Sequence, residues 1–275
     1  MPEVNLFANA PAGRADAPLL ILGPALGAPA SMWDGVATLL AADYRTQTFE
    51  HFGFNGAPVM HGAFSIADLA DAVVRLIDAA GAEKAFYAGD SISGAVALEL
   101  ARQHPDRVAA VASVCSVARK AGDPSMAPMA AAVRQEGTAS RTVDIGGRWF
   151  APGAQKRRAA EIAGLVESLS NADDQTYARY LEALDVHDIG DHLAEITVPV
   201  LAVWSEFDTG DGEGKMRFIA ENVQQGTLTG IEGAGHIPPL ERPEAVADVL
   251  RNFFRTAGES MPTTLAAHTS GPGAD

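Results

Sequence analysis

The sequence around Ser91 has the pattern that a serine nucleophile needs. A short apolar segment ends at Gly89, and a helix-like pattern begins within two residues of Ser91 in FYAGDSISGAVALELA. A nucleophile held in a tight turn between a strand and a helix needs small residues two positions before and two positions after it. Gly89 meets the first requirement, and Ser93 stands where glycine is usual. Ser91 is therefore the candidate nucleophile, and a serine that only caps the helix is the alternative.

A serine alcohol is a weak nucleophile, so it needs a base and an acid that orients the base. His236 lies in the glycine-flanked segment EGAGHIPPLERPE, which follows a predicted strand and precedes the last predicted helix. Asp208 ends the apolar segment PVLAVWSEFD, and sheets of parallel strands place their sites at the carboxyl ends of the strands. The order Ser, Asp, His predicts a catalytic triad of Ser91, Asp208 and His236, which performs acyl transfer. Three other histidines follow Ser91 before the C-terminal tail and lie in less suitable segments: His104, His187 and His192.

The elements that must position these residues alternate between buried strands and amphipathic helices. Strands are predicted at 19–23, 44–50, 85–88, 107–114, 197–208 and 226–236. Helices are predicted at 34–42, 65–81, from the Ser91 turn to about 104, and at 242–254. This alternation favours a mostly parallel sheet that is covered by helices on both faces.

The alternation stops in one long stretch of the chain. This stretch has helical patterns near residues 126, 154 and 172, no convincing strand, and no linker rich in Pro, Gly and Ser on both sides. A helical insertion into one domain therefore explains the pattern better than two separate domains. The predicted division is a discontinuous core of residues 1–118 and 193–257, a helical cap of residues 119–192, and a flexible tail of residues 258–275.

Composition and charge exclude several classes of protein. The 275 residues are enough to bury a large core without disulfides or a structural metal. The 35 Asp and Glu residues against 20 Lys and Arg give a net charge of −15, which argues against binding to nucleic acid or to anionic membranes. The single cysteine, Cys115, rules out a disulfide framework and a zinc site built on cysteines, and we expect it to be a buried strand residue.

The sequence shows neither the pattern of a signal peptide nor that of a membrane-spanning helix. The N-terminal segment lacks a basic region followed by an apolar region, which is the pattern of a signal peptide. No apolar run approaches the length of about 18 residues that a membrane-spanning helix needs. We therefore expect a cytoplasmic protein with no contact to a membrane.

Four segments of the chain resemble the α/β-hydrolase superfamily over about residues 19–254. They are PALGAPASMWD, GDSISGAVALELARQHPDRV, EGTASRTVDIGGRWF and EGAGHIPPLERPEAV. Within the superfamily, the chain is most similar to the 3-oxoadipate enol-lactonases of aromatic-acid catabolism, through SMWD in the first segment and RWF in the third. The resemblance implies an α/β-hydrolase fold with a helical cap.

The resemblance also implies roles for further residues. The backbone N–H groups of Leu26 and Ile92 would form the oxyanion hole. An enol-lactone carries a free carboxylate, and Arg148 and Trp149 in RWF would bind the substrate there. Weaker candidates for the cation are Arg119, Lys120 and Arg134.

The chain departs from the family pattern at three places, one of which is the N-terminal β-hairpin expected before residue 19, compressed here to residues such as Val4 to Phe7. The usual D-x-R-G after the second core strand is replaced by Glu50, His51, Phe52 and Gly53. Ser93 replaces the second glycine of the nucleophile motif. Asp90, beside the nucleophile, adds a negative charge if its side chain faces the pocket.

Together these features predict a serine hydrolase of the carboxylic ester type. It would cleave a small lactone or ester similar to 3-oxoadipate enol-lactone through an acyl-enzyme, with no metal and no cofactor. Three alternatives stay open: a carboxylesterase or C–C bond hydrolase with the same triad, a non-hydrolytic enzyme that reuses the His–Asp pair, and a small-molecule binder on the same fold. The resemblance allows a homodimer, but no segment dictates an interface.

Overall fold

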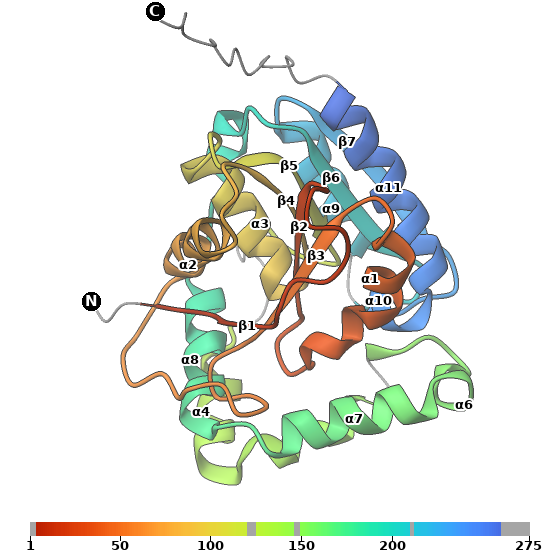
Figure 1. Ribbon diagram of the computed structural model, residues 1–275. Coiled ribbons are helices and arrows are strands. Elements are labelled where there is room, and N and C mark those ends of the chain that lie inside the picture. Colours follow the sequence, from red (N-terminus) through yellow and green to blue (C-terminus); the bar gives the residue numbers. More distant parts are fainter. Residues whose placement is uncertain (1–3, 120–124, 146–148, 210–211, 260–275) are drawn as a thin grey trace, which may run out of the picture.

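A seven-stranded sheet forms the centre of the protein (Figure 1). The computed structural model describes residues 4–119, 125–145, 149–209 and 212–259. Within these residues the strand order is β1-β3-β2-β4-β5-β6-β7, and every neighbouring pair is parallel except β1 with β3. The strands are β1 Phe7–Ala8, β2 Leu19–Gly23, β3 Arg45–Glu50, β4 Ala85–Asp90, β5 Val108–Val114, β6 Val200–Ser205 and β7 Gly226–Ile231. The predicted α/β-hydrolase architecture of the sheet is confirmed.

Helices cover both faces of the sheet. Helices α2 and α3 pack together on one face, and α1 and α11 pack together on the other (Figure 1). The helices outside the insertion are α1 Asp34–Leu40, α2 Ile66–Ala79, α3 Ile92–Gln103, α9 Gly212–Asn222, α10 Pro238–Glu241 and α11 Pro243–Glu259. Helix α2 begins where the sequence predicts, because Ser65 and Asp68 form a reciprocal capping box.

The segment between β5 and β6 is helical in the part that the structure describes. It contains α4 Ala127–Glu136, α5 Thr142–Asp144, α6 Ala154–Arg157, α7 Ala159–Ser170 and α8 Asp174–Asp185, with two short 3₁₀ helices at Thr138–Arg141 and Gly190–Glu195. Figure 1 shows α4, α6, α7 and α8 in green at one end of the sheet. Helices α4 and α8 pack against each other. The division into core, cap and tail stays a prediction.

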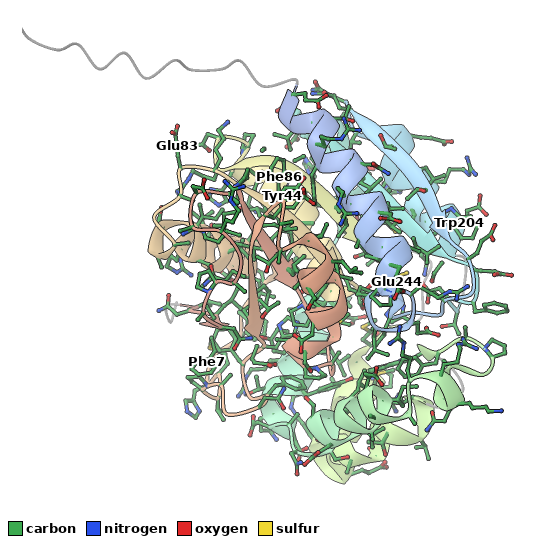
Figure 2. The ribbon with its side chains drawn as sticks, turned by 45° about the vertical axis from the view of Figure 1, so that its right-hand side comes forward. Phe7, Tyr44, Glu83, Phe86, Trp204 and Glu244 are labelled. Carbon is green, nitrogen blue, oxygen red and sulfur yellow. The ribbon has the colours of Figure 1, made fainter. Side chains whose placement is uncertain are left out.

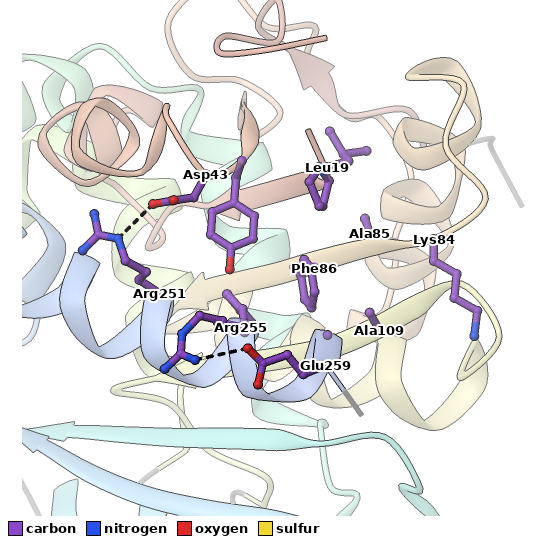
Figure 3. A pocket seen from close by; sticks show the side chains of 13 residues that line it. Leu19, Asp43, Lys84, Ala85, Phe86, Ala109, Arg251, Arg255 and Glu259 are labelled. Carbon is purple, nitrogen blue, oxygen red and sulfur yellow. Dashed lines mark hydrogen bonds and ion pairs between the residues drawn. The ribbon is translucent and has the colours of Figure 1, made fainter. Parts of the chain in front are cut away.

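An aromatic cluster closes the opposite end of the sheet, where the parallel strands begin. Tyr44 and Phe86 lie there with ring centroids 5.7 Å apart, and Phe254 of α11 lies 4.9 Å from Phe86 (Figure 2). A cavity of about 540 Å³ opens beside them (Figure 3). Two of its arginines are held in ion pairs, Arg251 with Asp43 and Arg255 with Glu259.

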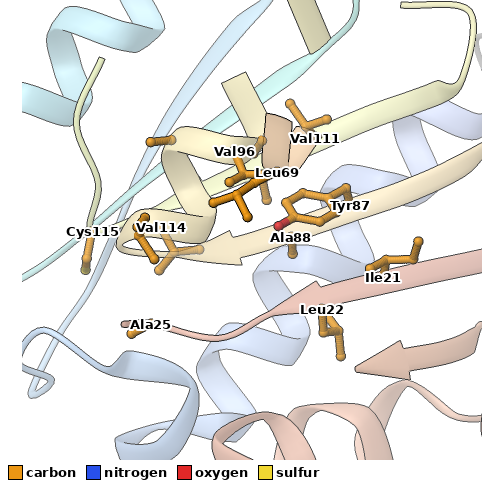
Figure 4. Packing of buried hydrophobic residues seen from close by; sticks show 14 of the residues in the cluster. Ile21, Leu22, Ala25, Leu69, Tyr87, Ala88, Val96, Val111, Val114 and Cys115 are labelled. Atoms are coloured by element: carbon orange, nitrogen blue, oxygen red, sulfur yellow. The ribbon is translucent and has the colours of Figure 1, made fainter. Parts of the chain in front are cut away.

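The core continues to the carboxyl ends of the strands. Leu69 of α2 and Val96 of α3 pack on the apolar side chains of β4 and β5 (Figure 4). Strands β2, β4 and β5 are buried along their whole length, as central strands of a parallel sheet must be. Gly23 pairs with Gly89 in the register of β2 and β4, so the loops that follow these two strands begin side by side.

Several element boundaries differ from the sequence prediction. Strand β4 continues to Asp90, and β6 ends at Ser205, so Asp208 lies in the turn after the strand and not at its end. After β6 the Glu206 N–H donates to the carbonyl of Ile231 at the end of β7, and the Phe207 N–H donates to the carbonyl of Ala234 in the loop that follows β7. Helix α11 extends to Glu259, beyond the predicted start of the tail.

We expect Gly89→Ala to destabilise the fold severely. A Cβ at Gly89 would lie 2.0 Å from the carbonyl oxygen of Ser93, which is a backbone atom and cannot move aside as a flexible side chain could. The expected loss is about 3 kcal/mol or more in the free energy of unfolding, measured by urea titration.

Gly164→Ala in α7 is the matched control. A Cβ there meets nothing within 4 Å, so this variant should gain roughly 0.5–1 kcal/mol from helix propensity. A Gly89→Ala protein as stable as the wild type would contradict the packing described for the turn.

Candidate active site

Ser91 occupies a strained turn between β4 and α3. Its φ of +55° and ψ of −117° are unusual for a residue with a side chain. The surroundings hold this conformation, because the Ser91 N–H donates to the Val114 carbonyl at 2.8 Å and the Ser91 carbonyl accepts from the Gly94 N–H at 2.9 Å. The Ser116 hydroxyl donates to the same carbonyl. The Ser91 side chain makes no capping hydrogen bond to α3, so the alternative in which this serine only caps the helix is not supported.

The histidine and aspartate predicted from the sequence lie next to Ser91. His236 Nε2 is 3.0 Å from Ser91 Oγ, and His236 Nδ1 is 2.8 Å from Asp208 Oδ1. The carboxylate accepts only, so Nδ1 carries the proton and Nε2 is free to accept from the serine hydroxyl. The side chain of Asp208 is 7% exposed and that of His236 is 24% exposed, so substrate can reach the imidazole but not the acid.

The electrostatic environment favours the protonated form of His236. Burial opposes the imidazolium, but the charge and hydrogen bond of Asp208, with a smaller contribution from Asp90, outweigh burial and raise the pKa of His236 to about 9. Asp90 is fully buried, and neither of its carboxyl oxygens has a hydrogen-bond partner among the described residues. Burial raises the pKa of Asp90 well above its usual value, because a carboxylate in this position has lost its contact with water.

The loop that carries His236 is tied to the segment between β5 and β6. The carboxylate of buried Glu241 accepts from the Gly235 N–H at 2.7 Å and from the Ala151 N–H at 3.0 Å. The backbone N–H of His236 donates to the backbone carbonyl of Trp149 at 2.8 Å. Glu241 follows His236 by five positions in the same motif. Nothing in the neighbouring sequence predicts that its carboxylate binds the backbone N–H of Gly235, just before the histidine.

The two residues predicted for the oxyanion hole lie on the loops that begin side by side. Leu26 follows β2, and Ile92 is the first residue of α3. In the part of the chain that the structure describes, neither N–H donates to an acceptor, as the start of a helix allows for Ile92. Both side chains are buried.

Trp149 lies against the candidate site. Its ring is 6.4 Å from the imidazole of His236, and its Cη2 is 3.1 Å from the position of a Cβ at Gly27. Arg148 lies outside the described residues, as does Lys120. The other two candidate cations are paired elsewhere, Arg119 with Asp191 at 2.6 Å and Arg134 with Glu182 at 2.6 Å.

The three other histidines that follow Ser91 before the C-terminal tail lie beside acidic residues outside the Ser91–His236–Asp208 chain, His187 with its Nδ1 3.8 Å from a carboxylate oxygen of Glu99. His104 pairs with Asp71, and His192 pairs with Glu195. Cys115 is buried as expected, but it lies one residue beyond β5 with a φ of +46°, and its Sγ is 3.3 Å from Ser205 Oγ.

A family model described as the alpha/beta hydrolase fold matches residues 18–243. The chain belongs to this family. It is 28% identical over 246 residues to 3-oxoadipate enol-lactonase 2 of Acinetobacter baylyi, which covers 88% of this chain and 91% of that protein. It is 25% identical over 248 residues to pimeloyl-[acyl-carrier protein] methyl ester esterase of Aeromonas salmonicida, covering 86% and 95%.

This α/β hydrolase is also similar in structure to an enol-lactonase. The enol-lactonase from Burkholderia xenovorans superposes with a TM-score of 0.83 at 25% identity, covering 91% of this chain and 96% of that one. The resemblance to enol-lactonases is therefore confirmed.

Among the described residues, no helix is long and apolar enough to span a membrane.

The pKa of His236 measures how strongly the Asp208 carboxylate stabilises the imidazolium. We expect NMR titration of ¹³C-labelled histidines to give a value above 6.5, near 9, because the charge and the hydrogen bond of Asp208 stabilise the imidazolium. In Asp208→Asn the stabilising charge is lost and burial remains, so the pKa should fall below 6.5. The His104 resonance in the same spectra is the control, and an unchanged His236 pKa in the variant would contradict the pairing.

Proposed function

We propose that this protein is a serine hydrolase that cleaves a small lactone or ester of the 3-oxoadipate enol-lactone type. The observation that carries the proposal is the continuous chain from Ser91 Oγ to His236 to Asp208, at 3.0 and 2.8 Å. These distances are those of a nucleophile, a general base and an orienting acid that are already aligned.

In the first half of the reaction, the neutral form of His236, whose share grows as the pH rises toward the pKa of about 9, takes the proton of Ser91 at Nε2 as Oγ attacks the carbonyl carbon. Asp208 keeps the imidazole oriented and stabilises its cation. The negative charge on the carbonyl oxygen is stabilised by the N–H groups of Leu26 and Ile92. The imidazolium then gives its proton to the leaving oxygen, and an acyl-enzyme forms on Ser91. For a lactone, the leaving oxygen stays attached to the acyl group.

In the second half, water attacks the acyl-enzyme. His236 accepts a proton from the water, and the tetrahedral intermediate again lies in the oxyanion hole. Its collapse returns the proton to Ser91 Oγ and releases a carboxylic acid. This chemistry uses no metal and no cofactor.

The substrate class rests on the similarity to enol-lactonases and on the position of Trp149. The indole lies beside both His236 and the Gly27 loop, where it can form an apolar wall for a small acyl group. Arg148 is the proposed partner of a substrate carboxylate. A net charge of −15 does not attract anions over long distances, so this cation has to act locally.

A carboxylesterase is the second candidate, and the similarity to a methyl ester esterase favours it. The triad and the oxyanion hole are the same in both cases. The substrate alone distinguishes them.

Steady-state hydrolysis of 3-oxoadipate enol-lactone, a neutral γ-lactone and p-nitrophenyl acetate tests both the chemistry and the substrate class. We expect the highest kcat/KM for the enol-lactone, and a loss of about five to six orders of magnitude in kcat in Ser91→Ala and in His236→Ala. A preference for p-nitrophenyl acetate over both lactones would favour the esterase. Substantial turnover by Ser91→Ala would overturn the acyl-enzyme mechanism.

A further inference from the structure

The carbonyl oxygen of Pro24 accepts two side-chain hydrogen bonds. Ser93 Oγ donates to it at 2.6 Å, and His51 Nε2 lies 2.9 Å from it. Both side chains are almost completely buried, with 0% of Ser93 and 1% of His51 exposed. Two buried donors on one backbone carbonyl form a rigid attachment, because each would be costly to leave without a partner.

The surroundings of His51 fix it as a neutral donor. A carbonyl oxygen only accepts, so Nε2 carries the proton, and Nδ1 has no partner among the described residues. The rings of Phe49, Phe54 and Tyr180 lie edge-on to the imidazole at centroid distances of 5.7, 6.3 and 4.9 Å. Burial lowers the pKa of His51 to about 4, so the ring carries no charge near pH 7.

Pro24 begins the loop that carries the Leu26 N–H. Other contacts hold the two ends of this loop. Trp33 Nε1 donates to the Gly23 carbonyl at 2.9 Å, and the Ala30 N–H donates to a carboxylate oxygen of Glu50 at 3.1 Å. Next to Pro24, the Ala25 N–H donates to Met32 Sδ at 3.3 Å and the Ala25 carbonyl accepts from the Ala28 N–H at 3.1 Å. The Pro24 carbonyl is the point on this side of Leu26 where side chains from the loop after β3 and from α3 meet the oxyanion loop.

We propose that Ser93 and His51 are positioning residues that together hold the Pro24 carbonyl and so fix the Leu26 N–H at the oxyanion hole. This inference rests on the proposed function. It gives a joint role to two of the places where the chain departs from the family pattern. Ser93 belongs to the nucleophile turn and His51 to the loop after β3, and their side chains meet at one atom.

Gly23 leaves room for the Ser93 side chain next to the oxyanion loop. A Cβ at Gly23 would lie 2.4 Å from the Tyr87 hydroxyl oxygen and 2.7 Å from the Cβ of Ser93, so glycine at 23 accommodates both side chains. In the register of the sheet, Gly23 pairs with Gly89, two residues before the nucleophile. The Ser93 hydroxyl therefore links the nucleophile turn directly to the oxyanion loop.

Ser93→Ala and His51→Leu each remove one donor, and the double variant removes both. His51→Gln is the conservative variant, because its amide nitrogen can donate from nearly the same position. Ser113→Ala is the matched control: this buried serine donates to the Gly94 carbonyl at 3.0 Å and does not touch the oxyanion loop. Kinetics with p-nitrophenyl acetate and amide hydrogen exchange of the peptide that contains residues 24–28 are measured for all five.

We expect each single variant to lower kcat by about tenfold and the double variant by about 10²–10³-fold, which is the effect of losing one oxyanion donor. KM should change by less than about threefold, because the contact acts on the transition state. His51→Gln should recover most of the activity that His51→Leu loses. Exchange at residues 24–28 should be fastest in the double variant, and Ser113→Ala should change neither kcat nor this exchange.

The two readouts separate this proposal from the proposed function. If the wild-type protein hydrolyses no ester or lactone, the proposed function fails, and hydrogen exchange alone decides whether the two donors fix the loop. Unchanged exchange at residues 24–28 in the double variant would overturn the proposal. Faster exchange with an unchanged kcat would equally overturn it, because the loop would then move without effect on the reaction.

Discussion

The close approach of β4 and α3 at Ser91 is the constraint on which the rest of the site depends. The chain reverses there within a few residues, and the backbone of the nucleophile takes a φ of +55°. Gly89 has no room for a side chain, and Gly94 lies so near Ser116 that a Cβ would be 2.5 Å from the Cβ of that serine. The turn directs the Ser91 hydroxyl away from the helix and toward the imidazole, at the cost of local strain that its hydrogen bonds offset.

Two other loops reach this turn, and buried polar groups hold both of them. Glu241 ties the His236 loop to the chain between β5 and β6. Ser93 and His51 hold the Pro24 carbonyl at the start of the oxyanion loop. In each case one buried acceptor group binds two donors that come from separate segments of the chain. Such networks are costly when they are incomplete, so the loops have one favoured arrangement.

The sequence predicts the fold and the three residues that the structure brings into hydrogen-bond contact, because the relevant signals are local. Apolar runs mark the strands, glycines mark the turns, and the order Ser91, Asp208, His236 follows from the order of the elements. The contacts that hold the loops could not be predicted, because Ser93 and Pro24 are 69 positions apart and His51 and Pro24 are 27 apart. The same limit explains the error at Asp208, whose turn is held by a local bond to the Ser205 carbonyl and by the bonds of Glu206 and Phe207 to β7 and the loop after it. The buried state of Asp90 also depends on the complete fold.

Reaction with a fluorophosphonate, read by intact mass and peptide mapping, tests the central claim most directly. An activated serine reacts with this reagent, whereas an ordinary serine does not. The account predicts one adduct, on Ser91, that is absent in Ser91→Ala and greatly slowed in His236→Ala. A folded wild-type protein that forms no adduct, or forms it on another residue, would contradict the claim that Ser91, His236 and Asp208 act as a nucleophile, a base and an acid.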